Sequence, residues 1–177
     1  MPRIITATGI SALKALGGTP SFMASAASSV VLRDITVHGG VAQHGAGGGV
    51  FATWTAGSLD VQLDNSLVEH CMSLVSGGGV AVMPSSPTTL VMAAAIAMRD
   101  IVVSNCSSAA GGGIAAWFVS LVATRAAFVH NTADTGGGAV YCQLCDVNLT
   151  ATDASHNVAG GKPQGATSLP STAVGGA

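Results

Sequence analysis

Hydrophobic and polar residues alternate along several short stretches of the chain. In residues 59–64, Leu, Val and Leu alternate with Asp, Gln and Asp, and residues 146–150 repeat the pattern as Asp-Val-Asn-Leu-Thr. Alternation with period two is typical of a half-buried β-strand. Residues 113–119 are more continuously apolar, as a strand buried on both faces would be. No stretch sustains a helical period, so the pattern predicts an all-β protein.

Glycine triplets separate these stretches, and each triplet precedes an apolar residue. Their first glycines follow one another at intervals of roughly 25–35 residues, a spacing typical of repeat proteins. Glycine accepts positive φ at no steric cost, so we interpret the triplets as tight corners between strands. The corner glycines are Gly47, Gly48, Gly49, Gly77, Gly78, Gly79, Gly111, Gly112, Gly113, Gly136, Gly137 and Gly138.

A second mark precedes each triplet, and it reads as an apolar residue, two variable residues and then Asn or His. Because it recurs in the same order as the triplets, we expect its polar residues to stack as one ladder. Cys71 and Cys106 directly follow the marked position and should stack in the same way. The ladder predicted from the sequence consists of His38, His70, Asn105, Asn131 and Asn157.

About three short strands fit into each repeat, and this describes one rung of a parallel β-helix. Each strand would pair with its counterpart one rung away, at about 4.8 Å. We expect four to five rungs over residues 30–161. Residues 1–29 would form an N-terminal cap or an incomplete start. Residues 162–177 are rich in Gly, Ser, Pro and Ala, so we expect a disordered tail.

Composition narrows the range of functions. The chain has 177 residues, of which only 8% are charged and 4% aromatic, against about 25% charged in a typical globular protein. The net charge of −2 and the scattered basic residues argue against a nucleic-acid partner. Mean hydropathy is +0.56, yet the longest apolar run, 109–124, contains three glycines and is shorter than the roughly 20 residues of a membrane span. We therefore expect no transmembrane helix.

The best-preserved repeat has Phe-Val-His-Asn at 128–131 and Gly-Gly-Ala-Val at 137–140. It resembles the repeat of chlamydial polymorphic membrane proteins, which pairs Phe-x-x-Asn with Gly-Gly-Ala-Ile. Residues 102–105 with 112–114 form a second copy, whereas the first two copies carry His in place of Asn. The resemblance covers roughly residues 30–161. It implies a right-handed parallel β-helix that is secreted or displayed on a cell surface, on the outer membrane if the source is bacterial.

The function implied by this resemblance is adhesion or structural scaffolding without catalysis. We also expect the chain to be a fragment of a larger protein. The partner would be a surface glycan or a protein. We also expect the isolated chain to self-associate, because an open parallel edge near Asn157 invites strand addition.

A carbohydrate-active enzyme of the polysaccharide lyase or hydrolase kind is the alternative. Asp34 and Asp100 each stand between Arg and Ile, and the repeat alignment places them two rungs, or roughly 10 Å, apart. That separation is near the range for an inverting glycosidase. No third acid or basic cluster accompanies the pair, so we interpret both as members of surface ion pairs and predict no catalytic residue and no cofactor.

The cysteines and histidines offer little metal chemistry in the sequence. Cys142 and Cys145 form a C-x-x-C motif, but a structural zinc site needs four ligands, and Cys71 and Cys106 belong to another column. We therefore favour a local disulfide or a surface thiol pair. The five histidines are interpreted as ladder or corner residues, and no metal site is predicted. They are His38, His44, His70, His130 and His156.

Overall fold

The computed structural model describes residues 4–8, 13–14, 22–25, 29–54, 58–85 and 94–160. These residues form β-strands and short turns, with no helix among them. Every pairing between the described strands is parallel. The predicted all-β class with parallel pairing is thus confirmed. Over the same ranges, nothing meets the length and hydropathy that a membrane-spanning helix requires.

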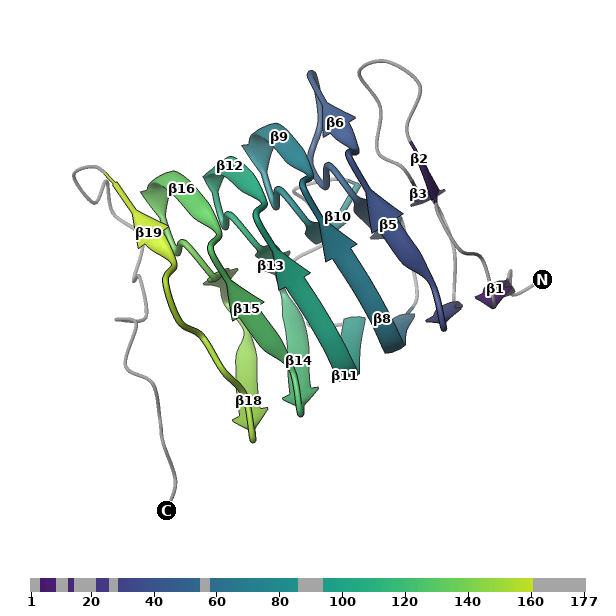
Figure 1. Cartoon of the computed structure of the whole chain (residues 1–177). Helices are drawn as coiled ribbons and strands as arrows, with labels where there is room; N and C mark the ends of the chain where they lie inside the picture. The colour runs from purple at the N-terminus through teal and green to yellow at the C-terminus, as the bar shows by residue number, and fades with distance from the viewer. Residues whose placement is uncertain are drawn as a thin grey trace.

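The strands belong to three sheets, which we call A, B and C (Figure 1). Sheet A contains β1 (Ile4–Thr8), β2 (Leu13–Lys14), β4 (Ser29–Arg33), β5 (Thr36–His38), β8 (Leu59–Glu69), β11 (Ala94–Ser104), β14 (Val119–Thr124), β15 (Ala127–Val129) and β18 (Asp146–Thr150). Sheet B contains β3 (Phe22–Ser25), β7 (Val50–Trp54), β10 (Val80–Pro84), β13 (Ile114–Trp117) and β17 (Val140–Gln143). Sheet C contains β6 (Val41–Ala42), β9 (Met72–Ser76), β12 (Ser107–Ala110), β16 (Thr132–Gly136) and β19 (Val158–Ala159).

From β4 onward the chain visits the sheets in a constant order: A, then C, then B, then A again. We call each such passage a circuit. Arg33 contacts Asp64 in the next circuit, 31 residues on, whereas Asp100 contacts Arg125 only 25 residues on. The longer circuits carry most of their extra residues between sheets B and A, since a single residue separates β13 from β14 but residues 85–93 separate β10 from β11.

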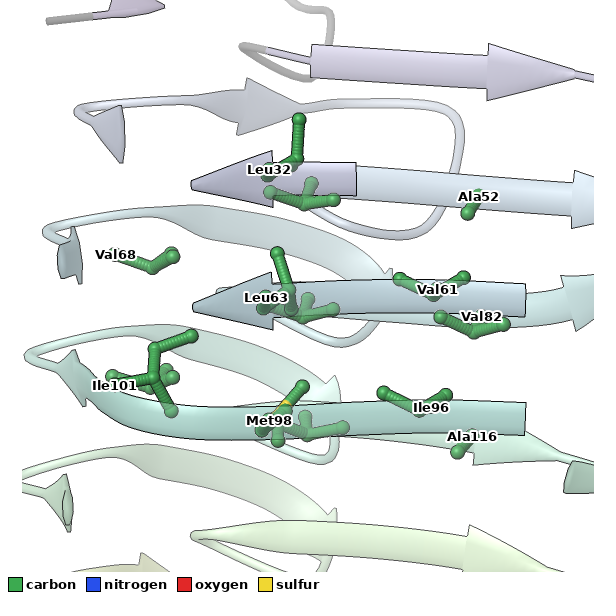
Figure 2. Packing of buried hydrophobic residues seen from close by; sticks show 14 of the residues in the cluster. Leu32, Ala52, Val61, Leu63, Val68, Val82, Ile96, Met98, Ile101 and Ala116 are labelled. Carbon is green, nitrogen blue, oxygen red and sulfur yellow. The ribbon is translucent and has the colours of Figure 1, made fainter. Parts of the chain in front are cut away.

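The sheets face a shared apolar interior, in which the parallel register stacks similar side chains. In sheet A, Val61 pairs with Ile96, and Leu63 pairs with Met98. These side chains are almost fully buried, and they lie above one another in Figure 2, as do Ala52, Val82 and Ala116 of sheet B. Burying a Val, Leu or Ile side chain contributes about 1.5–3 kcal/mol. The alternation seen in the sequence therefore places one side of each strand in this interior.

Sheet A bends at residues with positive φ, and these bends recur at the same place in every circuit. One bend is formed by Asp34, Asn65, Asp100, Arg125 and Ala151, all with φ between 44° and 55°. Apart from glycine, Asn and Asp accept this left-handed conformation most readily. Three of the five positions carry Asn or Asp, so in most circuits the residue type at this bend suits the backbone conformation.

The expected domain boundaries can be compared with the strands only in part. Inside residues 1–29, β1, β2 and β3 pair with β4, β5 and β7. The parallel pairing therefore continues upstream of residue 30, where the sequence placed the first repeat. The tail at 162–177 lies outside the described residues.

Candidate functional site

The expected Asn/His ladder is divided between two adjacent columns where sheet A turns into sheet C. Ser104 pairs with Glu69 and with Val129, so Asn105 aligns with His70 and His130. All three have φ between 51° and 57° and lie exposed at the corner. With Gly39 before them and His156 after them, these residues form what we call the corner column.

The residues that follow the corner form an inner column, which is Gly40, Cys71, Cys106, Asn131 and Asn157. Its register is carried by backbone hydrogen bonds: Ser107 N donates to Cys71 O, Thr132 N to Cys106 O and Val158 N to Asn131 O. Cys71 and Cys106 therefore stack, and so do Asn131 and Asn157.

Within the inner column, Asn131 is fully buried. Its side chain forms hydrogen bonds with both the preceding and the following circuit. Its Nδ2 donates to Asn157 Oδ1 at 3.0 Å and to Val103 O at 2.9 Å. Its Oδ1 accepts from Cys106 N at 3.0 Å. Because buried polar groups must be paired, this side chain is a structural link between circuits.

The single ladder of the sequence analysis is therefore corrected. His70 and Asn105 belong to the corner column, and Asn131 and Asn157 belong to the inner column. His38 belongs to neither column, because it pairs with Glu69, the residue directly before the corner. The sequence pattern allowed either Asn or His at its last position. Both residue types suit the left-handed corner, and Asn also suits the hydrogen-bonded interior. Residues of the two adjacent columns therefore matched the same sequence pattern.

The glycine triplets lie between sheets C and B, where circuits approach closely. A Cβ on Gly112 would lie 2.5 Å from both Gly138 O and Thr132 O, and one on Gly79 would lie 2.7 Å from Gly113 O. Gly47, Gly77, Gly111 and Gly137 have positive φ. The first three triplets are thus corners, with adjacent circuits too close for any side chain.

The fourth triplet is shifted by one residue relative to the sequence alignment. Ala110 pairs with Gly136, so the structural equivalent of residues 111–113 is 137–139, and Gly136 ends β16 instead. The offset arises because glycine also occupies position 136, which pairs with Ala110, whereas alanine occupies position 139. Ala139 tolerates its Cβ because the described residues place no further triplet against it.

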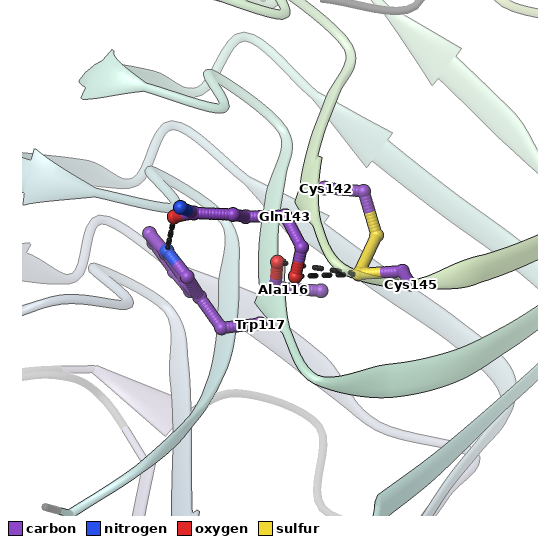
Figure 3. The surroundings of a disulfide bond; sticks show 5 residues. All are labelled: Ala116, Trp117, Cys142, Gln143 and Cys145. Carbon is purple, nitrogen blue, oxygen red and sulfur yellow. Dashed lines mark hydrogen bonds between the residues drawn. A yellow bond between two sulfur atoms is a disulfide. The ribbon is translucent and has the colours of Figure 1, made fainter. Parts of the chain in front are cut away.

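Cys142 and Cys145 are joined by a disulfide across the turn between β17 and β18. Figure 3 shows it beside Trp117, whose Nε1 donates to Gln143 Oε1 at 2.8 Å. Cys145 Sγ also lies 3.4 Å from Ala116 O in the preceding circuit. The bridge closes one corner of the last described circuit.

The two remaining cysteines, Cys71 and Cys106, are buried free thiols. Their Sγ atoms donate to the carbonyl oxygens of Glu69 and Ser104, both at 3.2 Å. Interaction with Cys71 and burial raise the pKa of Cys106 far above its ordinary value. A thiol held neutral in this way is a poor nucleophile, so Cys106 is a packing residue of the inner column.

Asp34 and Asp100 occupy one column two circuits apart, with Asn65 between them. All three line a shallow, open hollow on sheet A. Asn65 Nδ2 donates to Asp34 Oδ1 at 2.6 Å, and Arg125 makes two hydrogen bonds with Asp100, at 2.7 and 2.6 Å. Both acids are therefore engaged by neighbouring circuits.

The electrostatics of this hollow do not favour a general acid. The hydrogen bonds and charge of Arg125 lower the pKa of Asp100, whereas a glycosidase acid needs a raised pKa. Arg33 and Arg99 further surround Asp64 in the adjoining column, at 2.9 and 4.0 Å. The arrangement is one of cross-circuit ion pairs.

A cluster that the sequence analysis did not identify lies at the start of the corner column. His38 Nδ1 lies 3.3 Å from Glu69 Oε1, and His70 Nδ1 lies 3.7 Å from Glu69 Oε2. The two imidazole rings have centroids 5.1 Å apart. Its only sequence signal was the Glu-His pair at 69–70 with a His about one repeat upstream, and this required the correct register to interpret.

Two further histidines, His130 and His156, stack with ring centroids 4.8 Å apart farther along the corner column. His44 lies in the loop before the first triplet, between β6 of sheet C and β7 of sheet B. The described residues thus gather four of the five histidines along one edge.

Comparison with known proteins adds no relative: no protein-family model, curated protein sequence or solved structure matches this chain.

Proposed function

We propose that this chain is a right-handed parallel β-helix that acts as a non-catalytic adhesion or scaffolding module on a cell surface or in the extracellular space. The observation that carries this proposal is the constant order of three parallel sheets through successive circuits. Crossover connections between parallel strands of one sheet are right-handed in almost all proteins. A stack of this kind offers long, flat faces for contact with a partner.

The outer face of sheet C supports a role in binding. On β9, Met72, Leu74 and Val75 are exposed by 39%, 59% and 49%. Neighbouring strands present short side chains there, such as Ser107 and Thr132. Grouped apolar residues on an exposed surface often mark contact sites. A surface glycan or a protein is the partner class, and self-association through β17, β18 and β19, the end strands of the three described sheets, is part of the same proposal.

The disulfide supports the extracellular location, because disulfides persist mainly in oxidising compartments. Cys142 and Cys145 lie in the last described circuit, where part of the strand surface is exposed. A covalent bridge here would protect the end of the stack from fraying. The resemblance to polymorphic membrane protein repeats points to the same location.

The β-helix architecture is tested by deleting residues 105–129, which are one circuit of 25 residues. The deletion joins Ser104 to His130, a residue of the same corner column as Asn105. In a solenoid each circuit contacts only its neighbours, so the shortened chain should retain a β-type circular dichroism spectrum and cooperative unfolding.

The control deletion removes residues 105–128 and therefore keeps Val129 before His130. This variant moves Val129 into the left-handed corner and reverses inward and outward side chains downstream, so it should lose cooperative unfolding. Loss of structure in both variants would contradict the helical architecture. The comparison isolates register, because the two deletions differ by one residue.

The non-catalytic role is tested against the alternative of a carbohydrate-active enzyme. The observation that favours this alternative is that Asp34 and Asp100 line the same hollow. Pectin-like and other acidic polysaccharides are incubated with the chain, and new reducing ends or unsaturated products are measured. We expect no turnover. Cleavage that is lost in both Asp34→Ala and Asp100→Ala would replace the scaffold proposal with the enzyme.

Binding is measured in parallel with fluorescent beads that carry the chain and are mixed with intact cells. Wild-type beads should be retained, whereas Leu74→Asp should reduce retention several-fold by placing a charge on the exposed face of β9. Val122→Asp is the control, because it places the same charge at an exposed apolar residue on the outer face of sheet A, and it should leave retention unchanged. Equal retention of all three would contradict a binding role for sheet C.

A further inference from the structure

His38, Glu69 and His70 lie together because two circuits run in register at the corner between sheets A and C. His38 ends β5 and pairs with Glu69, the last residue of β8. His70 follows at once and has φ 54°, so the backbone turns its side chain back toward the carboxylate. One potential ligand atom from each of the three residues lies within 4.8 Å of the other two.

We infer that His38, Glu69 and His70 bind a divalent transition metal of the zinc class. Imidazole nitrogen and carboxylate oxygen bind Zn²⁺ at about 2.0–2.2 Å, so two ligand atoms of a tetrahedral site lie about 3.3 Å apart. The distance from His38 Nδ1 to Glu69 Oε1 is 3.3 Å, and that from His70 Nδ1 to Glu69 Oε2 is 3.7 Å. These two distances run to different oxygens of Glu69, and one ligand atom from each of the three residues lies within 4.8 Å of the other two. Side-chain rotations that shorten these separations by up to about 1.5 Å would therefore bring the donors onto one ion.

The ligand set also has the right charge and accessibility. Two neutral imidazoles and one carboxylate match the His₂Glu composition of metal sites that keep an open coordination position. The side chains of His38 and His70 are about half exposed, at 48% and 55%. An ion can reach them from solvent, and a water molecule or a partner's side chain can complete its coordination.

The rest of the corner column explains why the site is local. His130 has the same backbone conformation as His70, with φ 57°, and it stacks on His156. The position that Glu69 occupies beside His70 is taken by Val129 beside His130. The second histidine pair therefore lacks the carboxylate, which makes His130 a natural control.

The test titrates Zn²⁺ into the full chain by isothermal titration calorimetry. We expect one ion per chain for the wild type. His38→Ala, Glu69→Gln and His70→Asn should each weaken binding by about 100-fold or more, since even outer-shell partners of metal ligands change affinity by 10–100-fold. Asn is chosen at position 70 because Asn105 already occupies the same corner one circuit on, so the fold is preserved.

His130→Asn is the matched control and should leave Zn²⁺ affinity within about twofold of the wild type, since it removes a corner histidine that lacks a carboxylate neighbour. Substitution of Co²⁺ provides a second readout, because its visible bands report coordination by nitrogen and oxygen. A Co²⁺–thiolate charge-transfer band would place the ion at the cysteines and overturn the assignment. Unchanged affinity in His38→Ala, Glu69→Gln and His70→Asn would overturn it as well.

Discussion

Replacing Gly112 by alanine is expected to destabilise the protein by about 3–5 kcal/mol, or to prevent folding altogether. The added Cβ would lie 2.5 Å from the carbonyl oxygens of Gly138 and Thr132. Both atoms belong to the backbone of the next circuit, so no flexible side chain can move aside. Whole domains are stable by only about 5–15 kcal/mol, so this loss is large. It can be measured by urea unfolding followed by far-ultraviolet circular dichroism.

Gly45→Ala is the control, because a Cβ at Gly45 would meet nothing within 4 Å. Its free energy of unfolding should stay within about 0.5 kcal/mol of the wild type. A similar small change in Gly112→Ala would show that the circuits are not packed as closely as described.

Replacing Asn131 by alanine is expected to cost about 2–4 kcal/mol. Cys106 N and Val103 O would lose the Asn131 side chain as a hydrogen-bond partner, and both lie at the buried junction of sheets A and C. Asn157 Oδ1 would lose one of its two donors. The change in unfolding free energy is measured in urea, with the slope of the transition compared to exclude a change in cooperativity.

Asn105→His is the matched control for the neighbouring column. Asn105 is exposed at the corner, and histidine already occupies that corner in the circuits before and after it. The variant should therefore unfold within about 0.5 kcal/mol of the wild type. If Asn105→His were the more damaging of the two, the assignment of Asn131 to the interior would be wrong.

The regular features of the fold could be predicted because each depends on a local residue pattern. Alternation in residues 59–64 predicted a half-buried strand, and these residues form part of β8. The recurring triplets predicted repeated corners, and Gly48, Gly78 and Gly112 do lie where adjacent backbones leave no room for Cβ. The candidate metal cluster could not be predicted, since His38 and Glu69 meet only through pairing between circuits of unequal length.

The sequence by itself determined the strand class, the approximate repeat and the residue types that a corner accepts, because period-two burial and positive φ are local properties of the backbone. Only the tertiary structure decided which residues stand in one column. Gly136 and Asn105 were each placed one position away from their true equivalents, because a one-residue shift between circuits leaves the local pattern almost unchanged. Hydrogen bonds between neighbouring circuits set that register, and with it the side chains that meet.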